Sequence, residues 1–294
     1  MKVVLIGCVD FSESAFRCLL EQPDADIVGV VTRTSSSTNA DFRSLSPLAE
    51  THRIPCLAVE TGDQGPMAAW IRDRSPDAVL CFGWSRLLGG DLLSIPRLGT
   101  IGYHPALLPR HRGRHPIIWA LALGLTETGS TFFFMDEGPD SGDVLDQERV
   151  TIDDTDNAAT LYAKLTIVAG EQIARFIPLL AGNRAPRRPQ DPRLATYWRK
   201  RGKRDGQIDW RMPATGIHNL VRALTRPYPG AHAVIGDRDV PVWRTHLSAG
   251  RVDGVEPGKV LEVDGRTVTV QCGVGAITLV EHGFERLPSK GDYL

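Results

Sequence analysis

The hydrophobic positions in the first half of the chain alternate between short continuous runs and longer amphipathic stretches. Strands buried on both faces are predicted at VVLIG (3–7), DIVGVVT (26–32) and DAVLCFG (77–83). Helices are predicted between them, at SESAFRCLLEQ (12–22) and LSPLAETH (45–52). Buried strands separated by helices are typical of a parallel sheet covered on both faces, so this half is predicted to be a Rossmann-like α/β domain.

The pattern changes in the second half of the chain. A helix that begins with proline is predicted at 116–124, a strand at 130–138 and a long helix at 157–180. From residue 206 onward, a short helix is followed by five alternating segments separated by glycine-bearing turns. This alternation predicts a small antiparallel β barrel of the OB-like class.

Three parts follow from these patterns. The first is an α/β domain over residues 1–182, and the last is an OB-like β domain over 206–294. Residues 183–205 between them contain several prolines and many arginines, which favours a basic linker.

Composition narrows the class of protein. No run of about eighteen apolar residues occurs, so no membrane-spanning helix is expected. The first residues continue into a helical pattern without a small-residue cleavage site, which favours a core strand over a signal peptide. The five cysteines are scattered and form no CxxC, as is typical of a reduced cytoplasmic protein. The formal net charge of −1 disfavours a globally basic nucleic-acid binder.

One histidine follows a predicted strand in the stretch IGYHPALLPRHRGRHP (101–116). Open α/β sheets place ligands at the carboxyl ends of their strands, and His104 stands at such an end. The alternative is a histidine that only hydrogen-bonds loop backbone. The acidic stretch MDEGPDSGDV (135–144) supplies Asp140 as a partner for His104. An imidazole held by a carboxylate keeps one tautomer and suits general acid–base chemistry.

Metal binding is the other chemistry to weigh. The four acids of 135–144 offer fewer oxygen ligands at defined spacing than a divalent-cation loop needs, and a solvated turn remains the simpler alternative. His111 and His115 are separated by three residues, which is a possible metal pair, but arginines interrupt the spacing. No metal site is therefore predicted.

These motifs together carry a resemblance. HPALLPRHRGRHP (104–116) followed by MDEGPDSGDV resembles the N10-formyltetrahydrofolate-dependent formyltransferases, whose pattern is roughly Asn-x-His-x-Ser-Leu-Leu-Pro-x-x-Arg-Gly with a later Asp-x-Gly. GQIDW (206–210) and NLVRALTRPYPGAHA (219–233) resemble the C-terminal domain of methionyl-tRNA formyltransferase and the formyltransferase half of the bifunctional aminoarabinose enzyme. The resemblance covers nearly the whole chain and implies an enzyme that transfers a one-carbon group from N10-formyltetrahydrofolate to an amine.

The resemblance also implies a catalytic site of an asparagine, a histidine and an aspartate. His104 would move protons, Asp140 would support the charged imidazole, and the asparagine amide would donate to the oxyanion. Gly102 stands in the asparagine position. Losing one such donor costs about 2.7–4 kcal/mol elsewhere, so the departure matters. A glycine there also permits a left-handed backbone.

Three explanations of Gly102 stay open. Another donor substitutes, such as Ser85, a loop N–H or a water. The acceptor itself completes the site. Or the protein binds folate with little turnover. We expect the first, because the rest of the motif is present.

The folate site is implied by CFGWSRLLGG (81–90), which resembles the loop lining the pterin pocket of the family. Backbone groups of Arg86, Leu87 and Leu88 would meet the pterin ring. The other implied cofactor-binding residues are Arg114, Asp136, Glu137, Gly138, Pro139 and Asp140. For Trp84 and Leu88, ordinary core packing is the alternative.

The distribution of basic and acidic residues along the chain predicts the class of the formyl acceptor. Methionyl-tRNA formyltransferases usually carry a proline- and lysine-bearing insertion after the second strand, whereas residues 31–52 here are short and serine-rich with two arginines. Residues 206–294 hold ten basic and ten acidic residues, so they lack the clustered cations that phosphate binding needs. Residues 184–204 hold nine basic residues and one aspartate, which is a solvated run or an anion site.

We therefore expect a small amine acceptor, with a nucleotide-activated amino sugar as the candidate, and no membrane partner. A tRNA acceptor is the alternative, and a folate-binding protein without turnover is the third interpretation.

Overall fold

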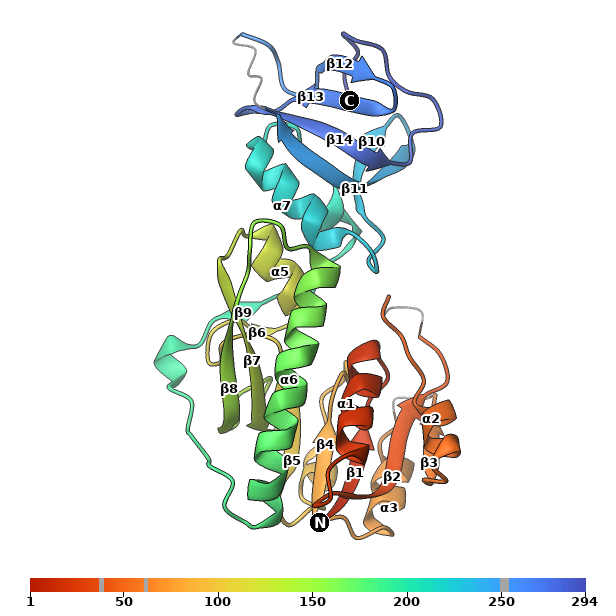
Figure 1. The fold of residues 1–294 in the computed structure, drawn as a ribbon, viewed down its shortest axis with the longest axis vertical. Helices are drawn as coiled ribbons and strands as arrows, with labels where there is room; N and C mark the ends of the chain where they lie inside the picture. Colours follow the sequence, from red (N-terminus) through yellow and green to blue (C-terminus); the bar gives the residue numbers. More distant parts are fainter. Residues whose placement is uncertain (37–39, 61–62, 249–253) are drawn as a thin grey trace. The chain divides into compact units, whose positions relative to one another are not determined.

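A computed structural model describes residues 1–36, 40–60, 63–248 and 254–294 (Figure 1). The described chain forms two compact units, which we call unit 1 and unit 2. Unit 1 comprises residues 1–116, 128–150 and 163–198. Unit 2 comprises residues 117–127, 151–162 and 199–294. In the described part of the chain, no helix is both long enough and apolar enough to cross a membrane.

The core of unit 1 is a seven-stranded sheet in the order β3-β2-β1-β4-β5-β7-β8. The strands from β3 to β5 are parallel, and β7 is antiparallel to β5. The strands are β1 (Lys2–Ile6), β2 (Asp26–Arg33), β3 (Cys56–Val59), β4 (Ala78–Cys81), β5 (Thr100–His104), β7 (Glu127–Phe134) and β8 (Val144–Thr151). The predicted α/β class with a largely parallel sheet is confirmed.

Helices cover both faces of this sheet. On one face, α1 (Asp10–Leu20) places Phe11 against Tyr103, and α6 (Ala158–Ala181) places Phe176 against Phe132 (Figure 1). On the other face, α3 (Gly65–Arg72) packs against alternate residues of β1 and β4. The remaining helices of the first half are α2 (Ser46–Thr51), α4 (Gly90–Leu93) and α5 (Pro116–Ala122). The long helix predicted at 157–180 and the proline-initiated helix at 116 are both found.

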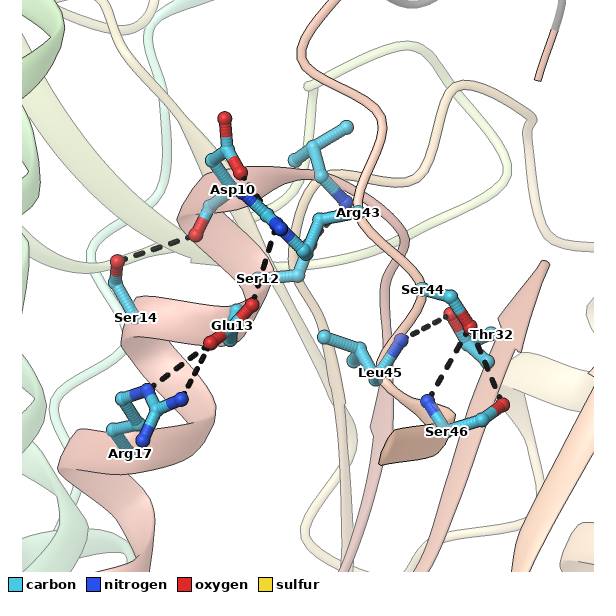
Figure 2. Close-up of polar contacts among 11 residues, drawn as sticks. Asp10, Ser12, Glu13, Ser14, Arg17, Thr32, Arg43, Ser44, Leu45 and Ser46 are labelled. Atoms are coloured by element: carbon cyan, nitrogen blue, oxygen red, sulfur yellow. Dashed lines mark hydrogen bonds and ion pairs between the residues drawn. The ribbon is translucent and has the colours of Figure 1, made fainter. Parts of the chain in front are cut away.

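The loop after β2 is tied to the start of α1 (Figure 2). Arg43 Nε lies 2.8 Å from Asp10 Oδ1 and 3.3 Å from Glu13 Oε2. Leu45 N–H donates to Thr32 Oγ1 at 3.1 Å, which anchors the entry to α2. Residues 37–39 of this stretch lie outside the described residues. One of the two arginines between 31 and 52 is therefore paired with acids of the same chain.

The segment predicted as a linker does more than connect two parts. Tyr197–Trp198 forms β9, which pairs in parallel with β6 (Arg112–Gly113). Arg188 exchanges both backbone hydrogen bonds with Val144, at 2.8 and 3.0 Å. Short 3₁₀ turns lie at Pro192–Leu194 and Lys203–Gly206. The part of the segment up to Trp198 is thus built into unit 1.

Unit 2 contains α7 (Ala214–Leu224) and a five-stranded antiparallel sheet in the order β10-β11-β14-β13-β12. The helix buries Ile217, Leu220 and Val221. The strands are β10 (Ala231–Ile235), β11 (Arg238–Ser248), β12 (Val260–Asp264), β13 (Thr267–Gln271) and β14 (Ala276–His282). The antiparallel all-β class is confirmed. Within the residues described on either side of 249–253, β10 and β12 do not pair, so the predicted barrel is not confirmed.

Candidate functional site

His104 is the last residue of β5, and its side chain is buried, with the residue 4% exposed. Its Nε2 lies 2.7 Å from the backbone oxygen of His111. A carbonyl oxygen only accepts, so Nε2 carries the hydrogen and donates. The neutral imidazole therefore presents Nδ1 as its basic nitrogen. The predicted position at a strand's carboxyl end is confirmed, and this ring does bond to loop backbone as well.

Asp140 faces the basic nitrogen of His104. Its Oδ2 lies 3.6 Å from His104 Nδ1, which is too long for a hydrogen bond. The same oxygen accepts from Gly113 N–H at 2.8 Å. The carboxylate thus acts on the imidazole through its charge, while the carbonyl of His111, rather than Asp140 as expected, sets the tautomer.

Asp140 adopts a left-handed backbone conformation, with φ of 55°. Aspartate and asparagine visit this region more readily than most side chains because they can hydrogen-bond locally. The turn around Asp140 is held by Gln190, whose amide nitrogen donates to the oxygens of Asp140 at 2.9 Å and Gly142 at 2.6 Å.

A buried arginine connects this turn to the neighbouring loop. Arg112, 4% exposed, donates to Gln190 Oε1 at 2.7 Å and to the Tyr197 hydroxyl at 2.9 Å. Burying a guanidinium is costly unless its donors find acceptors, so these contacts are needed to keep Arg112 inside. Arg112 and Gln190 together fix the loop of His111 to the turn of Asp140.

Gly102 lies in β5 directly opposite Phe133 of β7. A Cβ at this position would lie 2.8 Å from Phe133 Cζ and 2.9 Å from Met135 Cγ. Real Cβ atoms do not approach so closely, and Phe133 itself is buried. Gly102 is also not among the residues with positive φ, so the left-handed conformation considered from the sequence is wrong. The glycine is needed because aromatic and thioether side chains occupy the space beside it.

The loop after β4 presents the residues predicted to meet the pterin. Leu87 is 59% exposed, whereas Leu88 is 3% exposed and packs in the core with Trp84 against it. Core packing is thus the role of the Leu88 side chain. Gln64 pins the loop, since its amide nitrogen donates to Leu87 O at 2.7 Å and its oxygen accepts from Gly89 N–H at 2.9 Å. Arg86 is exposed on the same loop.

Arg114 connects this loop to the one that carries His111. Its Nη1 donates to Ser85 O at 2.9 Å. The two loops predicted to flank the folate and the catalytic histidine are therefore held to each other by an arginine that the resemblance places at the same site.

The acidic turn after β7 is shaped by its own side chains. Asp136 Oδ1 accepts from Gly138 N–H at 3.1 Å and from Ser141 Oγ at 2.7 Å. The Glu137 carboxylate lies against Gly90, and Pro139 is exposed. Across the described ranges, no group of three or more histidine, cysteine or acidic side chains is placed to hold a metal ion.

Sequence reasoning missed the supports of His104. They are the carbonyl of His111, the guanidinium of Arg112 and residues 190–198 of the segment predicted as a linker. The aromatic pair Tyr197–Trp198 inside a basic run was the available signal, because solvated charge runs seldom need two large aromatic residues.

The family model described as formyl transferase matches residues 1–177, and the model described as formyl transferase, C-terminal domain, matches residues 200–287. The chain belongs to the formyl transferase family.

Solved structures share its fold. WlaRD, a sugar 3N-formyl transferase, is similar with a TM-score of 0.71 at 15% identity, over 98% of this chain and 99% of that one. An N-formyltransferase from Helicobacter canadensis gives 0.71 at 15% identity, over 96% and 99%. Methionyl-tRNA formyltransferase from Clostridium thermocellum gives 0.63 at 16% identity, over 85% and 95%.

Proposed function

We propose that this protein transfers a formyl group from N10-formyltetrahydrofolate to the primary amine of a small acceptor, with a nucleotide-activated amino sugar as the candidate. The observation that carries the proposal is the buried imidazole of His104, whose basic Nδ1 faces the Asp140 carboxylate at 3.6 Å. The neighbours add support, since WlaRD was solved with dTDP and 5-N-formyl-THF, and the Helicobacter enzyme with folinic acid and dTDP-3-aminofucose.

The proposed chemistry needs one proton acceptor and one stabilised negative charge. The acceptor amine attacks the formyl carbon, a new C–N bond forms, and the bond from that carbon to N10 breaks. His104 takes the proton that the amine loses and returns it to the leaving nitrogen. Asp140 stabilises the imidazolium in between. Because Gly102 has no side-chain amide, the Ser85 hydroxyl is the proposed hydrogen-bond donor to the oxyanion.

The folate is proposed to lie against the loop after β4. Exposure of Arg86 and Leu87 on a loop that Gln64 holds in place supports backbone recognition of the pterin by Arg86, Leu87 and Leu88. The residues proposed to complete this site are Arg114, Asp136, Glu137, Gly138, Pro139 and Asp140.

A small acceptor is favoured by where the cations lie. Arg43 is paired with Asp10 and Glu13, Arg199 with Asp205, and Lys203 with Asp239. Cations engaged in this way are poorly placed to neutralise several phosphates. The domain boundaries at 182 and 206, the OB-like class of the β domain and a cytoplasmic location stay predictions.

The test is an assay of formyl transfer from N10-formyltetrahydrofolate to a panel of dTDP- and UDP-linked amino sugars. We expect one or more of the amino sugars to become N-formylated, at a rate proportional to the concentration of the protein. Folate binding without formylation of any amine would favour the folate-binding interpretation instead.

Asp140→Asn is expected to lower kcat about tenfold or more while the fold persists. Asparagine keeps an oxygen for Gly113 N–H and tolerates φ of 55°, but it removes the charge 3.6 Å from the imidazole. Steady-state kinetics and thermal unfolding check this together. An unchanged kcat in a folded variant would remove Asp140 from the mechanism.

The tRNA alternative predicts a salt-dependent complex. We expect no specific binding of initiator tRNA at physiological salt. If the alternative holds, binding is tight and salt-sensitive, and replacing the linker cations with alanine makes log K fall less steeply with log salt for each phosphate contact that is lost. The residues replaced are Arg199, Lys200, Arg201, Lys203 and Arg204. Tight, salt-sensitive binding by the unaltered protein would overturn the choice of a small acceptor.

A further inference from the structure

The segment Thr196–Trp198 lies along the loop that contains His111. Arg112 N–H donates to Thr196 O at 2.9 Å, and Arg114 N–H donates to Trp198 O at 3.0 Å. Gly113 between them has φ of 106°, and a Cβ there would lie 2.4 Å from Trp198 O. Only glycine permits so close an approach, so the loop is fitted to this segment.

His111 has a backbone conformation that needs support. Its φ is 64°, in the left-handed region, which costs a residue of this type about 1–2 kcal/mol. Such conformations persist only when surrounding contacts enforce them. Two side-chain contacts from the segment support this conformation: His111 N–H donates to Thr196 Oγ1 at 2.9 Å, and its ring stacks on Trp198 with centroids 4.0 Å apart and planes at 4°.

The protonation of His111 fits this arrangement. Burial, followed by the positive charge of Arg110, lowers the pKa of His111. The ring that stacks on Trp198 is therefore neutral near pH 7, and it adds no positive charge beside His104.

The conformation of His111 decides where its carbonyl points. That oxygen accepts from His104 Nε2 at 2.7 Å. If the carbonyl turned away, His104 could move its hydrogen to Nδ1 and donate it toward Asp140. The nitrogen that faces Asp140 would then no longer be able to take a proton.

We infer that Thr196 and Trp198 are positioning residues for His104: they hold His111 in the left-handed conformation whose carbonyl keeps the hydrogen of His104 on Nε2 and leaves Nδ1 as the proton acceptor. The consequence for turnover rests on the proposed function of His104. The tautomer itself does not, so the two can be tested separately.

The test compares substitutions that remove each contact with ones that retain it. Trp198→Ala and Thr196→Val remove the stack and the acceptor oxygen, whereas Trp198→Phe and Thr196→Ser retain an aromatic face and a hydroxyl. Nitrogen chemical shifts of ¹⁵N-histidine report the His104 tautomer, assigned with His104→Gln. Kinetics with the best acceptor report kcat and KM.

We expect the removing variants to lose the Nε2–H form of His104 and to lower kcat about tenfold or more, with KM for the formyl donor nearly unchanged. The retaining variants should preserve both the tautomer and most of kcat. A folded Trp198→Ala or Thr196→Val that keeps the wild-type tautomer overturns the inference.

Two further outcomes are informative. If Trp198→Ala fails to fold, the pair Thr196→Val and Thr196→Ser decides, because Thr196 is an exposed residue and only the valine variant loses the hydroxyl. If the unaltered protein formylates no amine, the proposed function fails alone, while the nitrogen shifts still confirm or refute the positioning by Thr196 and Trp198.

Discussion

His104→Ala lowers kcat for formyl transfer by about 10²–10⁴-fold, the range that a general acid–base contributes. The physical reason is that the variant loses Nδ1, the basic nitrogen that lies opposite Asp140. Folate affinity should change little, since the imidazole moves protons and the donor is held by the loop after β4. Rapid-quench turnover and folate titration measure the two effects separately.

His104→Gln is the matched control for this variant. A glutamine amide can still donate to the carbonyl of His111, but it cannot take a proton at pH 7. It should therefore fold like the unaltered protein and be as inactive as the alanine variant. If His104→Gln turns over like wild type, His104 is a structural residue and acid–base catalysis lies elsewhere.

Gly102→Asn destabilises the protein by about 1–3 kcal/mol, the usual cost of overpacking, and gives no gain in rate. An asparagine has to displace Phe133, whose ring lies 2.8 Å from the position of the new Cβ. The measurements are thermal unfolding and formyl transfer on the same preparation. A hundredfold gain in rate without loss of stability would contradict this and would mark the natural chain as a weak catalyst.

Two control variants separate the steric effect at Gly102 from the question of which group donates to the oxyanion. Gly102→Ala tests the clash alone, because alanine adds the Cβ without an amide. Ser85→Ala tests the proposed substitute donor and should lower the rate by about a hundredfold if its hydroxyl meets the oxyanion. An unaffected rate in Ser85→Ala would leave a backbone N–H, a water or the acceptor itself as the donor.

The fold was predictable where the pattern of burial is local. Continuous apolar runs such as 3–7 and 77–83 predict strands that are covered on both faces. The 24-residue helix α6 repeats its helical spacing of apolar residues over many turns, so it is also recognisable from the sequence. His104 was predictable as a candidate because a motif places it at the end of a buried strand. Asp140 was predictable from the same motif, although the hydrogen bond that its carboxylate accepts from Gly113 N–H was not.

The rest depends on contacts between residues far apart in the chain. Thr196 and Trp198 lie more than eighty residues from His111, and a basic run with prolines carries no periodicity that would reveal their partner. From the sequence alone, Gly102 indicates the loss of a side-chain amide, because the sequence shows only that glycine replaces the asparagine of the family pattern. It does not show that Phe133, the register partner on an antiparallel strand, fills the space.

The packing of Phe133 over Gly102 also constrains how this site can change by single substitutions. Adding a side chain at 102 first creates a clash, and truncating Phe133 first opens a cavity that costs about 3–5 kcal/mol. Each single step toward an amide-bearing site therefore passes through a less stable protein, although the double replacement restores the volume. Positions 102 and 133 are therefore expected to be coupled, and a library that varies both should reach an amide-bearing site with less loss of stability than one that varies position 102 alone.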